Sequence, residues 1–261
     1  MKEMLNELIQ YRHLLYMLVW RDVKIRYKQT AMGFLWAIFM PMMVVCAGLL
    51  IKKGMSIFSG KPMQMSELLS VTVKALPYSF FVGSIRFATG SLLGNRNLVT
   101  KIYFPREVFP IAAVMSNVFD FAIASTIFIF ILAITGFGVS IHALWLPWLI
   151  LMLVLLAIGM GMLLSCGNLF YRDVKYIVEA VLTFAIFFTP VFYEASLFGK
   201  WSTLLLLNPL GAILENINNV VVFHRPPDMV WLAYATIWSV GGLMISWRVF
   251  HKLEYAFAEN I

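Results

Sequence analysis

The stretch NRNLVTKIYFPREVFP, residues Asn95–Pro110, divides two apolar runs of the chain. About twenty residues before it contain a single charge, and about thirty residues after it contain a single acid, Asp120. Because about 20 apolar residues are enough to cross the hydrocarbon of a bilayer, the stretch is predicted to be a short loop between two spans. Short basic loops stay on the cytoplasmic side, and we interpret this one as a socket for an energy-supplying partner. Its basic residues are Arg96, Lys101 and Arg106.

The composition is that of an all-α polytopic membrane protein. Of the 261 residues, 61% are hydrophobic and 13% are charged, whereas a soluble domain has about 25% charged residues. The net charge of +7 comes from basic residues between the apolar runs, where they set topology rather than form a nucleic-acid surface. Cys46 and Cys166 lie inside apolar runs, and the sequence shows no disulfide framework and no metal-ligand spacing.

We predict six transmembrane helices with both termini in the cytoplasm. In this layout thirteen Lys and Arg residues fall on the inner side and six on the outer side. Lys74 is counted outside, in a polar connection over residues 54–74, whose GMSIFSGKP motif has the wrong spacing for a phosphate-binding loop. Gly159 and Gly161 lie in the fourth run, where small residues let helices approach closely. The apolar runs cover about residues 33–51, 75–94, 107–135, 144–167, 177–193 and 229–247.

A single membrane domain over residues 1–261 accounts for the whole chain. Its segments are residues 1–32 (interface helix and basic cluster), 33–193 (spans one to five), 194–227 (outer gate hairpin) and 228–261 (span six and cytoplasmic tail). The amphipathic start is interpreted as a helix on the membrane surface, with a solvated lead-in as the alternative. The outer gate hairpin contains two apolar halves broken at Asn208-Pro209. Each half is too short to cross, which favours a re-entrant helix pair over one kinked span.

Several motifs, in this order along the chain, resemble the membrane subunit of ABC-2 type polysaccharide exporters, the permeases for O-antigen, capsule and teichoic acid. They are DVKIRYKQTAMGFLWAIFMP at 22–41, NLVTKIYFPREVFP at 97–110, LFYRDVKYIVE at 169–179, FFTPVFY at 187–193 and LNPL at 207–210. The resemblance covers nearly the whole chain. It implies an ATP-driven exporter of lipid-pyrophosphate-linked polysaccharide, most of all O-antigen, in the bacterial inner membrane.

The resemblance also implies a division of labour. The permease is expected to work as a homodimer with two separate ATP-binding-cassette subunits, so ATP and Mg²⁺ would bind the partner and this chain would have no cofactor and no catalytic residue. The expected ATPase-coupling residues are Asn97, Leu98, Val99, Thr100, Lys101, Arg172 and Asp173. Membrane lipids and the lipid-linked polysaccharide are the other expected partners, with the polysaccharide entering between spans one and five.

Other residues are candidates for handling the glycan. Arg86 lies near the middle of the second span, where a lipid-facing charge is costly. It is interpreted either as a contact for the anionic pyrophosphate or as the ion-pair partner of Asp120 or Glu179. The expected substrate path is Arg86 with Phe80, Phe81 and Phe87. The expected site of lipid-pyrophosphate recruitment is Arg21, Lys24, Arg26 and Lys28, for which topology and headgroup binding are the alternative. The expected outer gate is Asn208 with Pro209.

Two other function classes stay open at this point. An intramembrane enzyme acting on lipid-linked sugars would need clustered acids or histidines, but Asp120, Glu179, Glu194 and Glu215 are spread over different predicted depths. An ABC-2 exporter for teichoic acid, capsule, small lipids or drugs would share the same layout. The sequence does not identify the glycan.

Overall fold

The computed structural model describes residues 9–28, 35–59, 64–101, 104–134, 138 and 140–257. All regular secondary structure within these ranges is helical. The α-helices are α2 (Arg12–Lys28), α3 (Leu35–Ser59), α4 (Met65–Gly94), α5 (Arg96–Lys101), α6 (Val108–Ile134), α7 (Leu146–Phe170), α8 (Val174–Phe188), α9 (Ser202–Leu206), α10 (Pro209–Val221) and α11 (Met229–Leu253). The 3-10 helices are η1 (Ile141–Trp145), η2 (Ala195–Trp201) and η3 (Glu254–Ala256).

Five helical segments of the described chain are long and apolar enough to cross a membrane. They are Leu35–Phe58, Met65–Gly94, Val108–Phe130, Ile141–Phe170 and Met229–Ala256. These segments confirm the prediction of an all-helical chain with several spans. The fifth predicted span, 177–193, corresponds to α8, which has only 15 residues and is shorter than the ~20 residues of a full crossing.

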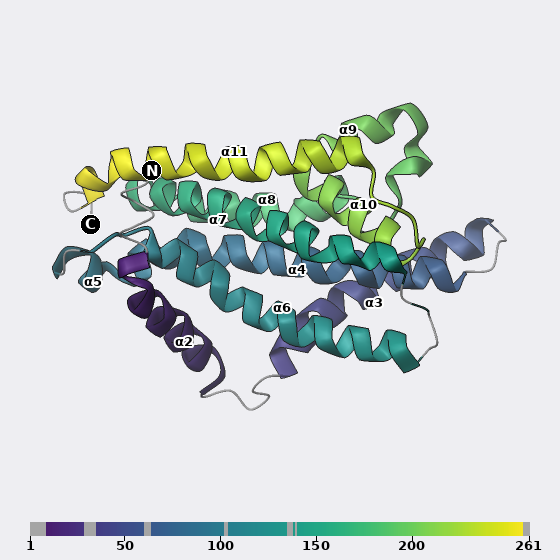
Figure 1. Ribbon diagram of the computed structural model, residues 1–261, viewed down its shortest axis with the longest axis horizontal. Helices are drawn as coiled ribbons and strands as arrows, with labels where there is room; N and C mark the ends of the chain where they lie inside the picture. Colours follow the sequence, from purple (N-terminus) through teal and green to yellow (C-terminus); the bar gives the residue numbers. More distant parts are fainter. Residues whose placement is uncertain are drawn as a thin grey trace.

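The bundle has two distinct ends, which we call the α5 end and the α10 end (Figure 1). Helix α7 finishes at the α5 end, whereas α11 begins at the α10 end, so the chain between them passes from one end to the other (Figure 1). Helix α8 begins this passage. The start of α2 and the 3-10 helix η3 both lie at the α5 end (Figure 1).

Helix α4 forms the centre of the bundle. It contacts α3, α6, α7, α8 and α10, and its side chains are buried along most of its length. Helix α7 lies between α4 and α11. A Cβ on Gly161 of α7 would lie 2.7 Å from the Cβ of Ala88 in α4, so the predicted close approach of helices at this glycine is confirmed.

The start of α4 corrects the sequence prediction. The helix begins at Met65, whereas the apolar run begins near residue 75. Lys74 therefore does not belong to a loop, because it lies within α4 and its side chain is only 1% exposed. The first turns of α4 are helical because Leu69, Val71 and Val73 are buried against neighbouring helices.

Helix α2 confirms a helix within predicted segment 1–32, while residues 1–8 and 29–32 lie outside the described residues.

The segment 194–227 breaks at Asn208-Pro209 as predicted. Asn208 accepts a hydrogen bond from the backbone N–H of Leu210 at 3.1 Å, and Pro209 occupies the first turn of α10. Both residue types favour a helix start at these positions.

Candidate functional site: the α4–α6 loop and the neighbouring charges

The predicted socket is a short helix, α5, placed directly after α4. Asn95 joins the two helices: its side-chain amide donates to the carbonyl oxygen of Ser91 at 2.8 Å, and its own carbonyl oxygen accepts from Leu98 N–H at 2.9 Å. Val99 is buried and Leu98 packs beside it, whereas Asn97 is exposed. One face of α5 is therefore anchored in the bundle and another faces outward. The side chains of Thr100 and Lys101 lie outside the described residues.

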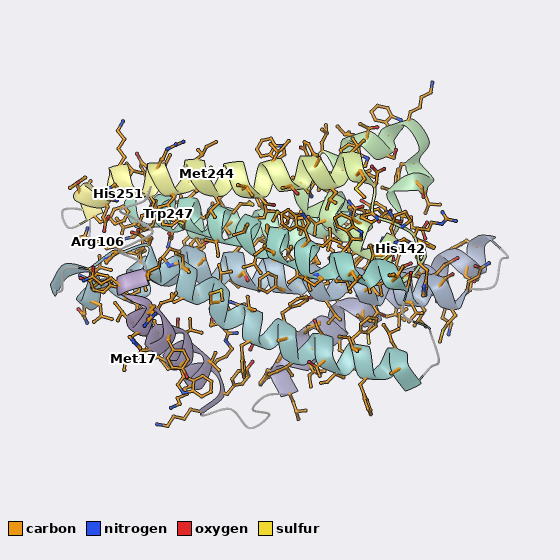
Figure 2. The ribbon with its side chains drawn as sticks, in the orientation of Figure 1. Met17, Arg106, His142, Met244, Trp247 and His251 are labelled. Atoms are coloured by element: carbon orange, nitrogen blue, oxygen red, sulfur yellow. The ribbon has the colours of Figure 1, made fainter. Side chains whose placement is uncertain are left out.

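The end of this loop is fixed by the C-terminal tail. The Arg106 guanidinium donates to the carbonyl oxygen of Glu254 at 2.6 Å, and the Arg106 backbone N–H donates to the Glu254 carboxylate at 3.2 Å. The indole N–H of Trp247 donates to the buried carboxylate of Glu107 at 3.2 Å. Figure 2 shows Arg106 and Trp247 together at the α5 end. Sequence reasoning missed this anchor. The mixture of aromatic and charged residues in the tail RVFHKLEYAFAENI is the signal that could have indicated a packed segment.

The other predicted coupling residues, Arg172 and Asp173, lie in the turn between α7 and α8. Both are exposed. Because α7 finishes at the α5 end (Figure 1), this turn and α5 belong to the same end of the bundle. The structure thus offers two exposed segments at one end for a partner to contact.

Arg86 is paired with Glu179. Its Nε donates to the two carboxylate oxygens of Glu179 at 2.8 and 3.0 Å, and this contact joins α4 to α8. The side chains of Arg86 and Glu179 are 49% and 37% exposed. Of the two partners considered from the sequence, Glu179 is correct and Asp120 is not. The pair is open to a competing anion because neither side chain is buried.

The aromatic candidates on α4 have different environments. Phe80 and Phe81 are buried in the main core, and Phe80 packs against Phe121 at 5.3 Å between ring centroids. Neither ring is accessible to a sugar in this conformation. Phe87 is exposed, and the Arg26 guanidinium lies 4.3 Å from its ring centroid. Among these three rings, Phe87 is therefore the accessible one.

Arg26 docks α2 onto α6. It forms an ion pair with Asp120 and donates to Ser116 Oγ at 3.2 Å and to Asn117 Oδ1 at 3.3 Å. The hydroxyl of Tyr27 also donates to Asp120. Burial raises the pKa of Tyr27, and the hydrogen bond to Asp120 raises this pKa further. Asp120 is thus occupied by α2 and is unavailable to Arg86.

Of the other three residues in the basic cluster, Arg21 forms an ion pair, whereas Lys24 and Lys28 are exposed. Arg21 pairs with the adjacent Asp22 at 2.7 Å. Lys24 and Lys28 are exposed on α2, and Lys24 lies 5.6 Å from the ring centroid of Trp20. Two of the four predicted recruitment residues, Lys24 and Lys28, therefore present their charges outward.

At the α10 end, a buried ion pair holds the segment between α8 and α11. Lys74 Nζ lies 3.3 Å from Glu215 Oε2 and donates to the carbonyl oxygen of Tyr193 at 2.6 Å. Glu215 Oε1 accepts from the Ala195 N–H at 2.9 Å. Asn208, the predicted gate residue, donates from its side-chain amide to Thr189 Oγ1 at 3.0 Å. These contacts tie the segment after α8 to both α4 and α10, and Lys74 and Glu215 were missed from the sequence.

The geometry is that of a helical bundle with an anchored short helix, α5, at one end and a separately held helical segment at the other. A sequence model of the family described as "ABC-2 type transporter" matches residues 13–221. The chain belongs to this family. It is therefore an integral membrane protein and a transporter component.

Curated relatives of similar length support this membership. The chain is 28% identical to "O-antigen export system permease protein RfbA" of Myxococcus xanthus over an alignment of 269 residues that covers 100% of both chains. It is 27% identical to the protein of the same name from Klebsiella pneumoniae, over 92% of this chain and 91% of the relative.

Proposed function

We propose that this ABC-2 family member is the permease subunit of an ATP-driven exporter that moves lipid-pyrophosphate-linked O-antigen across the bacterial inner membrane. The observation that carries the proposal is the similarity, over nearly the whole chain, to relatives named O-antigen export permeases. The molecule supplies the membrane path, while a separate ATP-binding-cassette subunit binds ATP and Mg²⁺. A hydroxyl-rich polymer needs such a path because burying unpaired hydroxyls in hydrocarbon is costly.

The proposed topology has six crossings, with both termini in the cytoplasm. The passage of the chain between the end of α7 and the start of α11 supports α8 as the fifth crossing (Figure 1). The basic residues of the α5 end support a cytoplasmic location for that end. The α10 end then faces outward, and η2, α9 and α10 form the re-entrant pair of the outer gate around Asn208 and Pro209.

Coupling to the ATPase is assigned to α5 and the turn between α7 and α8. The exposed Asn97 and the exposed Arg172 and Asp173 are the contact points. Helix α5 follows α4 with only Asn95 between them. A displacement of α5 by the ATPase would therefore be transmitted to α4, the central helix. Residues Leu98 to Lys101 complete the coupling helix.

Recognition of the carrier pyrophosphate is assigned to Arg86, with Phe87 beside it. An arginine can bind phosphate through two parallel hydrogen bonds. In its contact with Glu179, Arg86 uses only its Nε–H, which is shared between the two carboxylate oxygens. The pyrophosphate would replace Glu179. Lys24 and Lys28 supply additional positive charge on the surface of α2, while Arg26 orients Phe87 and Arg21 stays paired.

The contact surface for a second copy of the chain is assigned to the exposed apolar face of α8. This face consists of Ile177, Val181, Phe184 and Phe188, which are spaced three or four residues apart and so lie on one side of a helix. A shallow apolar hollow of about 430 Å³ beside Phe184 and Phe188 extends this face. Such a surface needs an apolar environment, which a second copy and the surrounding membrane lipids provide.

The decisive experiment is deletion of the gene in its own host. We expect loss of surface O-antigen and accumulation of lipid-linked polysaccharide inside the cell, with rescue by the wild-type chain. Normal surface polysaccharide in the deletion strain contradicts the proposal, and accumulation of another cargo would reassign the substrate.

A second experiment tests the coupling helix. Lys101→Glu, or deletion of Asn97 to Thr100, is expected to abolish export and co-purification of the ATPase while membrane insertion is kept. Lys200→Glu, the same charge reversal on the exposed η2 at the opposite end, is the matched control. Normal export by the Lys101→Glu variant would remove the coupling assignment.

A further inference from the structure

A polar cavity of about 430 Å³ lies at the α10 end, between the η2–α9 segment, α10 and the start of α11. The lining of this cavity includes Glu194, Ser202, Asn219, Glu215, Arg225 and Trp231. The volume is in the range of small-molecule binding pockets, roughly 300–1,000 Å³. The three elements that surround the cavity meet at the upper right of Figure 1.

One wall of the cavity is held in place by Lys74. Both carboxylate oxygens of Glu215 are used, one by Lys74 at 3.3 Å and the other by the Ala195 N–H at 2.9 Å. Since Lys74 is almost fully buried, this ion pair is shielded from solvent and keeps α10 and η2 at a fixed separation. A wall that is already ordered loses little conformational freedom when a ligand binds.

Other groups in the cavity have unused hydrogen-bonding capacity. Within the described ranges, the side chains of Glu194, Ser202 and Asn219 make no hydrogen bond, and all three are only partly exposed. The guanidinium of Arg225 is exposed and lies 5.9 Å from the ring centroid of Phe223. A carboxylate accepts, a guanidinium donates, and an amide or hydroxyl does both. This mixture matches a ligand whose groups both donate and accept.

The lining of the cavity carries no excess positive charge. Glu215 is paired with Lys74, and Asp228 is occupied because its carboxylate accepts from Val230 N–H and Trp231 N–H at the start of α11. Asp228 keeps its negative charge, so two acids, Glu194 and Asp228, remain against one cation, Arg225. The cavity has no excess positive charge for a phosphate, so a neutral ligand is favoured.

An aromatic wall completes the match. Trp231 lines the cavity and is partly exposed. Its ring offers an apolar face for the C–H side of a sugar ring, while the polar groups receive the hydroxyls. We propose that this cavity binds a neutral sugar residue of the exported glycan at the outer end of the permease. Only the origin of the sugar rests on the proposed export function.

The test is direct binding to the full-length wild-type chain in lipid nanodiscs. The probe is a neutral oligosaccharide released from the host's own surface polysaccharide, and binding is measured by calorimetry or by saturation-transfer NMR. We expect Glu194→Gln and Trp231→Leu each to weaken binding about tenfold, the cost of one lost favourable contact. Trp238→Leu, on the exposed side of the same helix, is the matched control and should bind as the wild type does.

Two results would overturn the inference: absence of oligosaccharide binding by the wild type, or binding that Glu194→Gln and Trp231→Leu both leave unchanged. Inorganic phosphate serves as the anionic probe, and its displacement of the oligosaccharide would overturn the assignment to a neutral ligand. If Trp231→Leu fails to fold, Glu194→Gln alone decides. The gene deletion is read separately, so normal export without the protein would refute the proposed function and leave the cavity measurement intact.

Discussion

A Cβ placed on Gly159 of α7 would lie 3.1 Å from both the backbone nitrogen and the Cα of Leu243 in α11. The two helices therefore meet backbone to backbone at this point. Close approach of this kind stabilises helix pairs in membranes because it increases van der Waals contact. The contact makes α7 and α11 a closely packed pair on one side of α4.

Adding one methyl group at this contact should destabilise the protein. Gly159→Ala forces the α11 backbone to move, and overpacking typically costs about 1–3 kcal/mol. Gly241→Ala is the control, because no atom lies within 4 Å of a Cβ at Gly241. The control should be neutral or stabilising, since alanine is the better helix former. Thermal unfolding can be followed with a thiol-reactive dye in a Cys46→Ser background, since Cys46 is exposed in the folded protein whereas Cys166 is buried until the bundle opens.

The Lys74–Glu215 pair should be more sensitive to neutralisation than the partly exposed Lys52–Glu67 pair, which joins α3 to α4. Glu215→Gln leaves an almost fully buried lysine without its counter-charge, which should cost on the order of 3 kcal/mol. Glu67→Gln is the control. Glu67 lies 3.4 Å from Lys52, and the side chains of Glu67 and Lys52 are 39% and 10% exposed. Water reaches this pair from the glutamate side, so the loss of Glu67 should cost less than the loss of Glu215.

The double variant Lys74→Met/Glu215→Gln separates charge from shape. Removing both charges should recover most of the stability lost in Glu215→Gln, because no buried charge is left unpaired. The free energies of unfolding in detergent of the wild type, Lys74→Met, Glu215→Gln and the double variant give the coupling energy. Equal stability of Glu215→Gln and Glu67→Gln would show that Lys74 does not depend on its carboxylate.

The Arg86–Glu179 pair can be tested by exchanging its charges. Arg86→Ala leaves Glu179 without its counter-charge, so the folding of this variant is first checked by thermal unfolding in detergent. Arg86→Ala should reduce export and glycan-stimulated ATPase activity. The exchange variant Arg86→Glu/Glu179→Arg restores an ion pair but moves the guanidinium to α8. We expect it to remain defective, because the pyrophosphate needs the cation at Arg86.

Full recovery of export by the exchange variant would contradict a role of Arg86 in binding the pyrophosphate. The pair would then serve only to join α4 to α8, and the carrier would be recognised elsewhere. Glu179→Gln distinguishes the same two roles, since it frees Arg86 without removing it.

Asp120→Asn should detach α2 from α6. The substitution removes the counter-charge of Arg26 and weakens the hydrogen bond from Tyr27. Amide hydrogen exchange in α2 should become faster while exchange in α7 stays unchanged. Asp22→Asn, which affects only a neighbouring pair on the same helix, is the control. Unchanged exchange in α2 of Asp120→Asn would show that apolar contacts alone hold the helix.

The sequence predicted a span well where the apolar run and the helix have nearly the same bounds. The apolar run at 107–135 corresponds to α6 at Val108–Ile134, and the run at 144–167 to α7 at Leu146–Phe170. It failed at the start of α4, because hydropathy reports transfer to lipid and not the continuation of backbone hydrogen bonds. The ten residues from Met65 to Lys74 are held by burial against other helices, which a one-dimensional pattern does not contain.

Only part of the candidate site was predicted, because the pattern of apolar runs does not contain the packing between helices. The apolar runs around Asn95–Pro110 placed α5 between two long helices, and the position of Arg86 inside a run marked it as exceptional. Its partner was narrowed to two acids, and only the fold shows that Asp120 is occupied by Arg26. Lys74 and Glu215 are 141 residues apart, so their pairing depends on how α4 and α10 pack.

Helix α8 is also shorter than its neighbours. Its 15 residues extend about 22 Å, roughly 8 Å less than the ~30 Å hydrocarbon layer. With α8 as the fifth crossing, the surrounding lipid must thin locally to meet it, and that hydrophobic mismatch costs energy. The deformed lipid beside α8 would shorten the distance that a polar headgroup travels to reach Arg86. Export in membranes of short-chain lipids should accordingly be faster than in membranes of long-chain lipids.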